Sequence, residues 1–284
     1  MLLDRLRPSG TLRAWALPLL LLFVSGCASA PRGPAAAPVA VDSESLWRLY
    51  EQAVVAARYP QPKHVSTKLV PILLHTPGLV WDVPGQKVLM AAWTKAQHYT
   101  GQPPYDDTIP VYLWLTAAPF LRQFCQQTGL QGDALRLRMA ERLGLPPDAS
   151  YDAVVQMWVD PHEIFRSCPD PEVTDHECEV NLTPGLVDPS ASCPWSAALQ
   201  NQLSGQFVSV SESHLDWMCS NWSKTYPPGS PRQSFPWTAL GYTYDWGGSD
   251  FHGESEFVLS ANSPVVIESV TPTDVYCAPE ASSR

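Results

Sequence analysis

The sequence predicts an α+β fold, with a small antiparallel sheet, packed helices, long Pro- and Gly-rich loops and disulfide bonds. Three observations lead to this prediction. Apolar residues recur at helical spacing in three segments, short apolar runs bounded by turn residues occur before and after the central helices, and single strands do not alternate with single helices along the chain. An antiparallel sheet with helices packed against one side is the simplest arrangement of such elements.

Three helices are predicted from apolar spacing and from their end signals. The first follows the N-cap residue Asp42 and ends near Tyr59. Helical spacing resumes over residues 119–127 and again over residues 133–143, and a glycine follows each of these segments.

Short apolar runs predict the strands. Residues 79–81 and 88–93 flank a turn and read as two joined strands. The same pattern predicts further strands, the last two of them as a closing pair, at residues 111–115, 154–159, 257–259 and 265–267. Pro and Gly are dense between these runs, from residue 168 to 193 and from 227 to 248, so we expect disulfides rather than secondary structure to order those parts.

The chain divides by composition into three parts. Residues 42–284 have the composition of a single globular domain, and no second linker interrupts them. Residues 27–41 are rich in Ala and Pro and read as a tether, whose 13 residues after Cys27 and up to Ala40 reach about 40 Å if extended. Residues 1–26 carry three arginines before or beside an apolar run at residues 14–24. That run is too short to cross roughly 30 Å of hydrocarbon, so it predicts a signal peptide that is removed.

The end of this signal has a distinctive form. Val24, Ser25, Gly26 and Cys27 resemble the lipobox of bacterial lipoproteins. The resemblance covers only the first 27 residues, and it implies that Cys27 becomes the acylated first residue of the mature protein, held in the lipid bilayer by two or three acyl chains. Because Ala28 stands where an aspartate would retain a lipoprotein in the inner membrane, the resemblance implies the outer membrane, with the domain facing the periplasm or the cell exterior. The alternative is an ordinary secretory signal cleaved after residues 28–30, which would release a soluble product.

The charge balance excludes some partners. The chain has a formal net charge of −10, and removal of residues 1–26 makes it −12 because three arginines and one aspartate leave with them. No run of Lys or Arg follows Cys27. We therefore expect no nucleic-acid partner, since such proteins need a basic surface to displace counterions.

Six cysteines remain after Cys27, an even number in an oxidising compartment. Six thiols allow fifteen connectivities. Cys168 and Cys178 close a short loop and are the easiest pair to form, which leaves Cys193 with Cys219 and Cys125 with Cys277 as the pairs obtained by elimination. A zinc site is the competing interpretation, but no Cys-x-x-Cys or paired-histidine spacing occurs, and we predict neither a metal site nor a cofactor.

Three segments of distinctive sequence are similar to motifs of an uncharacterised family of exported bacterial proteins. They are residues 168–172 with Cys178, residues 235–247, and residues 255–258. The resemblance implies a family and no activity.

The second of these segments is aromatic. Trp237, Tyr242, Tyr244 and Trp246 occur there, and the last three alternate, so an extended backbone would place their rings on one face. A row of rings suits a glycan, whose apolar faces stack on aromatic surfaces. The other interpretation is that these rings form the core of a Pro-rich, disulfide-linked domain.

An acidic cluster precedes and follows Cys168. Its carboxylates could bind calcium, or His162 and His176 a transition metal, but no EF-hand spacing is present, and a solvated acidic loop is the simpler interpretation. The members are Asp160, Glu163, Asp170, Glu172, Asp175, Glu177 and Glu179.

Two functions from different classes remain. The first is a membrane-anchored, non-catalytic binding or scaffold protein of the envelope, with a glycan or an envelope protein as its partner. The alternative is a glycoside hydrolase directed at the cell wall or a polysaccharide, with Asp245, Glu254 and Glu256 as candidate carboxylates, since such chemistry needs two of them about 5–9 Å apart. A calcium-stabilised module is a third interpretation. Ser213, His214 and Asp216 are neighbours that cannot face one another as a hydrolytic triad must.

Overall fold

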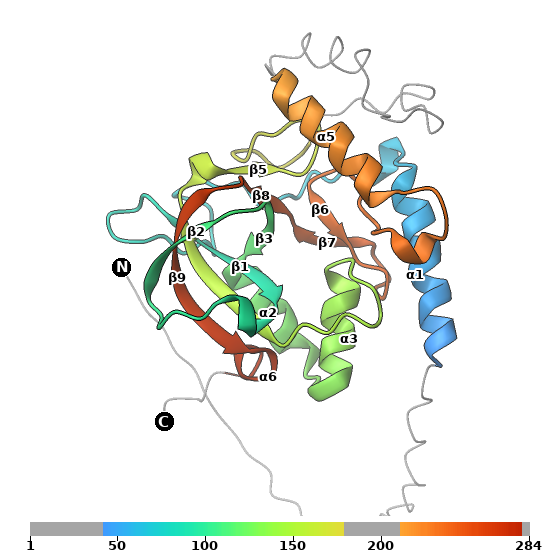
Figure 1. Ribbon diagram of the computed structural model, residues 1–284, viewed down its shortest axis with the longest axis horizontal. Helices are drawn as coiled ribbons and strands as arrows, with labels where there is room; N and C mark the ends of the chain where they lie inside the picture. Colours follow the sequence, from blue (N-terminus) through green and yellow to red (C-terminus); the bar gives the residue numbers. More distant parts are fainter. Residues whose placement is uncertain (1–41, 179–210, 280–284) are drawn as a thin grey trace, which may run out of the picture. The chain divides into compact units, whose positions relative to one another are not determined.

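The computed structural model describes residues 42–178 and 211–279, which contain five helices and nine strands (Figure 1). Both ranges belong to one compact unit of the chain. The predicted signal peptide, the tether and Cys27 lie outside the described residues, as do Cys193 and Glu179. None of the helices in the described ranges is both long enough and apolar enough to cross a membrane.

Seven strands form one sheet in which every neighbouring pair is antiparallel. This confirms the α+β fold with an antiparallel sheet, but the sheet is larger than predicted. In their order across the sheet the strands are β2 (Tyr105–Ile109), β9 (Ser263–Pro272), β4 (Ala153–Val159), β1 (Val88–Thr94), β3 (Leu113–Ala117), β8 (Phe257–Leu259) and β5 (Ile164–Arg166).

The predicted closing pair is wrong. Residues 257–259 and 265–267 are both in strands, but β8 pairs with β3 and β5, whereas β9 pairs with β2 and β4. β9 is ten residues long and curved along one side of the sheet, which lets it contact both of its partners (Figure 1). Each partner is more than 90 residues away in sequence, so local turn signals carry no information about these pairings.

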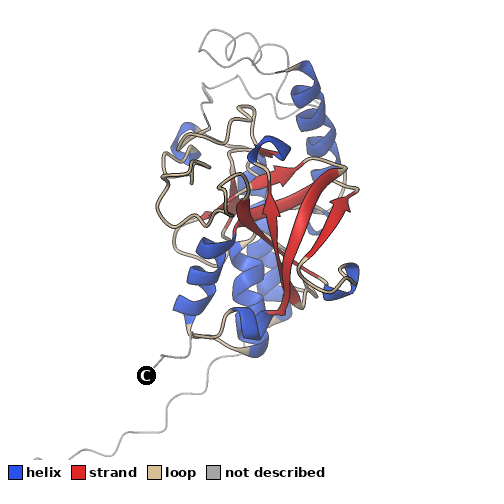
Figure 2. Cartoon of the chain, turned by 90° about the vertical axis from the view of Figure 1, so that its left-hand side faces the viewer, coloured by secondary structure: helices blue, strands red, loops and turns tan. Residues whose placement is uncertain are grey.

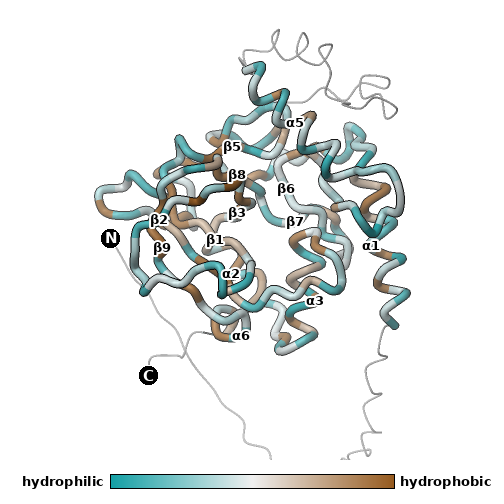
Figure 3. The backbone as a smooth tube through the Cα atoms, in the orientation of Figure 1, coloured by the Kyte–Doolittle hydropathy of each residue, from teal (hydrophilic) through white to brown (hydrophobic). Residues whose placement is uncertain are grey.

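The central strands are apolar on both faces because both faces are covered. On one face, Met90 of β1 and Met157 of β4 pack with Phe257 and Ile267 in a core around which the sheet curves. On the other face, Trp93 packs against the helices that follow β3. The most hydrophobic stretches of backbone accordingly lie in the sheet, and the peripheral loops are mostly hydrophilic (Figure 3).

The three predicted helices are present. α1 (Ser43–Arg58) begins at Asp42, whose side chain accepts a hydrogen bond from the Ser45 backbone N–H at 2.9 Å. α2 (Ala118–Thr128) ends at Gly129, which has a φ of 64° and supplies the left-handed cap that glycine adopts most easily. α3 (Gly132–Arg142) follows at once, and most of the helices lie on one side of the strands (Figure 2).

The remaining elements build a second layer beside the large sheet. A two-stranded sheet of β6 (Tyr242–Tyr244) and β7 (His252–Ser255) packs with α1 and α5 (Glu212–Thr225) around a core of aromatic side chains. The short helix α6 (Thr273–Tyr276) follows β9 directly.

Two of the predicted disulfides are confirmed. Cys125 in α2 bonds to Cys277 after α6 across 152 residues, and Cys168 bonds to Cys178 across ten. The first bond ties the end of β9 to the helical layer. The third predicted pair includes Cys193, which lies outside the described residues, so that pair stays a prediction.

Candidate functional site

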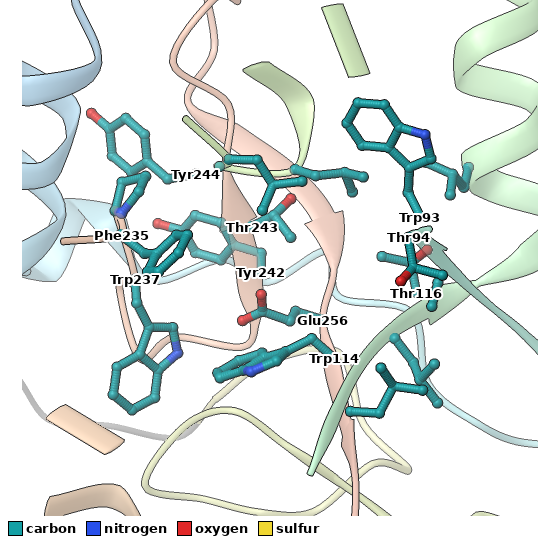
Figure 4. Close-up of a pocket in the computed structure, with 18 of the residues that line it drawn as sticks. Trp93, Thr94, Trp114, Thr116, Phe235, Trp237, Tyr242, Thr243, Tyr244 and Glu256 are labelled. Atoms are coloured by element: carbon teal, nitrogen blue, oxygen red, sulfur yellow. The ribbon is translucent and has the colours of Figure 1, made fainter. Parts of the chain in front are cut away.

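A cavity of about 420 Å³ lies between the large sheet and the small one (Figure 4). β1 and β3 form one wall, and β6 with the loop before it forms the facing wall. The segment that follows α3, the end of α5, Leu121 of α2, Tyr151 and Glu256 contribute the rest of the lining. A volume of this size is within the range of small-molecule sites.

The lining of the cavity is largely apolar, and seven of its residues are aromatic. Trp114 lies on the floor, with its ring centroid 5.9 Å from that of Trp237 in an edge-to-face arrangement. Phe235 and Lys224 are the exposed members of the lining that mark its mouth. The rings come from segments that are far apart in sequence: Trp93, Trp114, Tyr151, Phe235, Trp237, Tyr242 and Tyr244.

Strand alternation explains why β3 serves the cavity. Thr116 pairs with Ala91 of β1, and both residues line the cavity, as does Trp114 two residues earlier. Leu115 and Ala117 alternate with them and belong to the core within the curved sheet, although Leu115 and Leu113 of the same strand also border the cavity. The same strand therefore supports the hydrophobic core with one face and the cavity with the other.

Glu256 is the carboxylate of the described chain that lines the cavity. It joins β7 to β8, and its backbone N–H donates to the Gly241 carbonyl at 2.9 Å. Its carboxyl group points toward the space between Trp114, Trp237 and Tyr242 (Figure 4). Figure 4 also shows Thr116 and Trp93 on the opposite side of that space.

The electrostatic environment of Glu256 is unusual. The Ser167 hydroxyl donates to Oε2 at 2.5 Å, and within the described ranges no residue donates a hydrogen bond to Oε1 or forms an ion pair with the carboxylate. Burial raises the pKa of Glu256 to about 7, and the Ser167 hydrogen bond opposes that rise only in part. The group thus changes its charge near neutral pH.

Three other lining residues carry a buried polar atom that lacks a hydrogen-bond partner in the described part of the chain. These atoms are Oγ1 of Thr116, Nδ2 of Asn221 and Nε1 of Trp237. Unpartnered buried polar groups are costly in a folded protein, and they occur preferentially where a ligand or water completes the bonding.

The structure separates the three predicted carboxylates. Asp245 accepts hydrogen bonds from Arg138 at 2.6 and 2.8 Å, and Glu254 accepts one from Arg142 at 2.8 Å. Both arginines come from α3, and neither of these two carboxylates lines the cavity. Only Glu256 of the three faces open space.

The predicted aromatic platform is divided in a similar way. Trp237, Tyr242 and Tyr244 line the cavity, while Trp246 lies beyond β6 and packs edge-to-face against Tyr50 of α1. The Trp246 indole N–H donates to the Leu145 carbonyl at 2.9 Å. The four rings therefore do not form one exposed row. Three of them line the wall of the cavity, and Trp246 packs outside it.

Three members of the acidic cluster, Asp170, Glu172 and Asp175, interact electrostatically with one buried cation, Arg166. Asp175 lies 3.7 Å from Arg166, a fully buried arginine that also donates to the Asp175 carbonyl at 2.6 Å. Asp160 caps a short helix and contacts His162 at 2.8 Å, and the His176 ring contacts the Leu69 carbonyl. Among the residues with described positions, no group of three or more His, Cys, Asp or Glu side chains is arranged to hold a metal ion.

Sequence reasoning missed Trp93, Trp114 and Thr116 as site residues. The alternation within the predicted strand 111–115 already places Trp114 opposite Leu113 and Leu115. The pattern does not show which segment faces Trp114. That segment, which contains Phe235 and Trp237, lies more than 120 residues further along the chain.

Comparisons with known proteins assign no function to this cavity. The chain matches no protein family, no curated protein and no solved structure.

Proposed function

We propose that this protein is a bacterial lipoprotein of the outer membrane, anchored through acylated Cys27, whose domain binds a small ligand in the aromatic cavity without catalysing a reaction. The cavity carries the proposal. It is concave, it is lined largely by aromatic and aliphatic side chains, and it contains the carboxylate of Glu256 together with three buried polar atoms that lack a hydrogen-bond partner among the described residues. This combination is typical of small-molecule binding sites.

The arrangement of carboxylates favours binding over glycoside hydrolysis. A glycosidase needs an acid and a second carboxylate about 5–9 Å apart on either side of the scissile bond. In the described chain, Glu256 has no carboxylate opposite it in the cavity lining, and Asp245 and Glu254 are held by arginines. Turnover of a bound glycan would revive the hydrolase alternative.

Anchoring is tested with Cys27→Ser in the full-length chain. We expect the wild-type protein to sediment with membranes and to incorporate labelled palmitate, because two or more acyl chains hold a protein stably in a bilayer. The Cys27→Ser variant should lose the label and, if it is exported at all, should leave the membrane fraction. Cys125→Ala/Cys277→Ala is the matched control, since it changes cysteines of the domain and should keep the label. Unchanged palmitate incorporation in Cys27→Ser would contradict the anchor.

Binding is tested on residues 42–284, purified with their disulfides intact, by tryptophan fluorescence and calorimetric titration. The panel contains soluble peptidoglycan fragments, oligosaccharides, aryl-alkyl alcohols and aryl-alkyl amines. We expect at least one class to bind and to quench indole fluorescence, and we expect Trp114→Leu to weaken that binding by about tenfold or more, because Trp114 forms the floor of the cavity.

The control variant is Trp158→Leu, a tryptophan of β4 whose indole hydrogen-bonds Glu268 away from the cavity. It should bind as the wild type does. Absence of binding by every class, or equal binding by wild type and Trp114→Leu, would overturn the assignment of the cavity as a ligand site.

A further inference from the structure

Glu256 differs from the two buried carboxylates beside it in sequence. Asp245 lies 2.6 Å from Arg138, and Glu254 lies 2.8 Å from Arg142, so each of these charges is compensated within the protein. Glu256 accepts a hydrogen bond from the Ser167 hydroxyl and forms no ion pair with a described residue. Glu256 is partly buried, so its ionised form loses part of its hydration without gaining an ion pair with a described residue, and such a charge is disfavoured.

The groups around this carboxylate suit a cation. Trp114, Trp237 and Tyr242 surround the space in front of it (Figure 4). The faces of aromatic rings carry negative electrostatic potential and attract cations, tryptophan most strongly. Oε1, to which no residue of the described ranges donates a hydrogen bond, adds an acceptor for an N–H group.

We propose that Glu256, together with Trp114 and Trp237, forms a subsite for the protonated primary or secondary amine of a ligand whose apolar body fills the rest of the cavity. This inference rests on the proposed ligand-binding function and adds the chemical class of the ligand. The ammonium group donates a hydrogen bond to Oε1 and lies against the indole faces. Its positive charge forms the ion pair that the Glu256 carboxylate does not make with a described residue.

Glu256 is the acidic group of the lining whose charge changes near neutral pH. The other charged or titratable groups around it act as follows. Tyr242 and Tyr244 from β6 stay neutral, since burial raises the pKa of both phenols. Lys224 from α5 is exposed at the mouth and repels a cation. Ser167, beside the end of β5, stabilises the ionised carboxylate through its hydrogen bond.

The pH dependence of binding follows from these groups. An amine needs ionised Glu256, so below pH of about 7 binding must expel a proton from the carboxyl group. Its affinity should then fall by up to about tenfold per pH unit as the pH decreases. A neutral ligand of the same shape does not need that ionisation, so its affinity should stay level or fall as the pH rises above 7.

The experiment compares 2-phenylethylamine and tryptamine with their isosteric alcohols, 2-phenylethanol and tryptophol, by calorimetric titration of residues 42–284 between pH 5.5 and 8.5. The amines stay protonated over this range. At pH 8 we expect each amine to bind at least about tenfold more tightly than its alcohol, a difference of about 1.4 kcal/mol.

Three variants separate charge from shape. Glu256→Gln should abolish the preference for the amine while keeping the affinity for the alcohol. Ser167→Ala should move the midpoint of the amine pH profile upward, because it removes a bond that lowers the pKa of Glu256. Lys224→Ala should tighten amine binding severalfold, since a like charge leaves the mouth.

The outcomes distinguish the two proposals. Equal affinity of amine and alcohol at pH 8, or a Glu256→Gln variant that still prefers the amine, would overturn the amine subsite. If the alcohols or the saccharides of the panel nevertheless bind in a Trp114-dependent manner, the cavity remains a ligand site. Failure of every compound to bind would overturn both proposals.

Discussion

Replacing both Cys125 and Cys277 with alanine is expected to lower the free energy of unfolding by about 5 kcal/mol. The bond closes a loop across 152 residues, and in the chain-entropy description the stabilisation by a disulfide grows with the logarithm of loop length. Both cysteines are almost fully buried, and the bond connects α2 to the segment after β9. Without the disulfide, the segment after β9, the longest described strand, is no longer tied to the helical layer.

Two hydrogen bonds remain in the variant and should keep its native fold. The Tyr276 hydroxyl donates to the Ala118 carbonyl at 2.7 Å, and the Gln126 amide donates to the Ala278 carbonyl at 2.8 Å. Urea denaturation followed by circular dichroism measures the difference in stability. The matched control, Cys168→Ala/Cys178→Ala, opens a loop of only ten residues and should cost about 3 kcal/mol. A smaller loss for the long loop than for the short one would contradict the entropic explanation.

The second large effect concerns Glu256 and pH. Its pKa is raised from 4.5 to about 7 in the folded protein, so between these pH values the unfolded chain has lost the proton that the folded protein keeps. Stability must then decrease as the pH rises through this interval, and it levels off above pH 7 after a loss of about 3 kcal/mol. At pH 4 and below, both states hold the proton and the group makes no contribution.

Glu256→Gln isolates this contribution because glutamine keeps the shape and cannot ionise. The difference in unfolding free energy between variant and wild type should shift by about 3 kcal/mol in favour of the variant between pH 4.5 and pH 8. Denaturant titrations at four or five pH values measure it. Glu254→Gln serves as a contrast, because it removes the partner of Arg142 and should destabilise at pH 8. A constant difference between wild type and Glu256→Gln across the pH range would contradict a raised pKa of Glu256 in the folded protein.

Helix formation was the most predictable part of this fold. α1, α2 and α3 depend on contacts three or four residues apart and on caps such as Asp42 and Gly129, all of which are visible in the sequence. The apolar runs also indicated where most of the central strands lie. Their pairing was not visible, because β8 and β9 find partners far away in the chain, and the predicted contact between them does not form.

The candidate site shows the same division more sharply. Asp245, Glu254 and Glu256 are close in sequence and equivalent as carboxylates, and nothing local distinguishes them. Two arginines of α3 compensate Asp245 and Glu254, while Glu256 meets Trp114 from the middle of the chain. The pKa of a carboxyl group depends on its neighbours in space, so only the folded chain could single out Glu256.

The sequence by itself determined α1, α2 and α3 and the position of most of the sheet's strands, because these follow from short-range spacing. It favoured the short Cys168–Cys178 loop and reached the Cys125–Cys277 pair only by elimination, and the structure confirmed both. It also supplied the lipobox, from which we propose the membrane anchor. Tertiary structure alone decided the strand order, the division of the aromatic segment between core and cavity, and the isolation of one acidic side chain among rings from distant elements. The physical reason is that packing and burial act between residues brought together by the fold, and a local pattern does not specify which distant segments will meet.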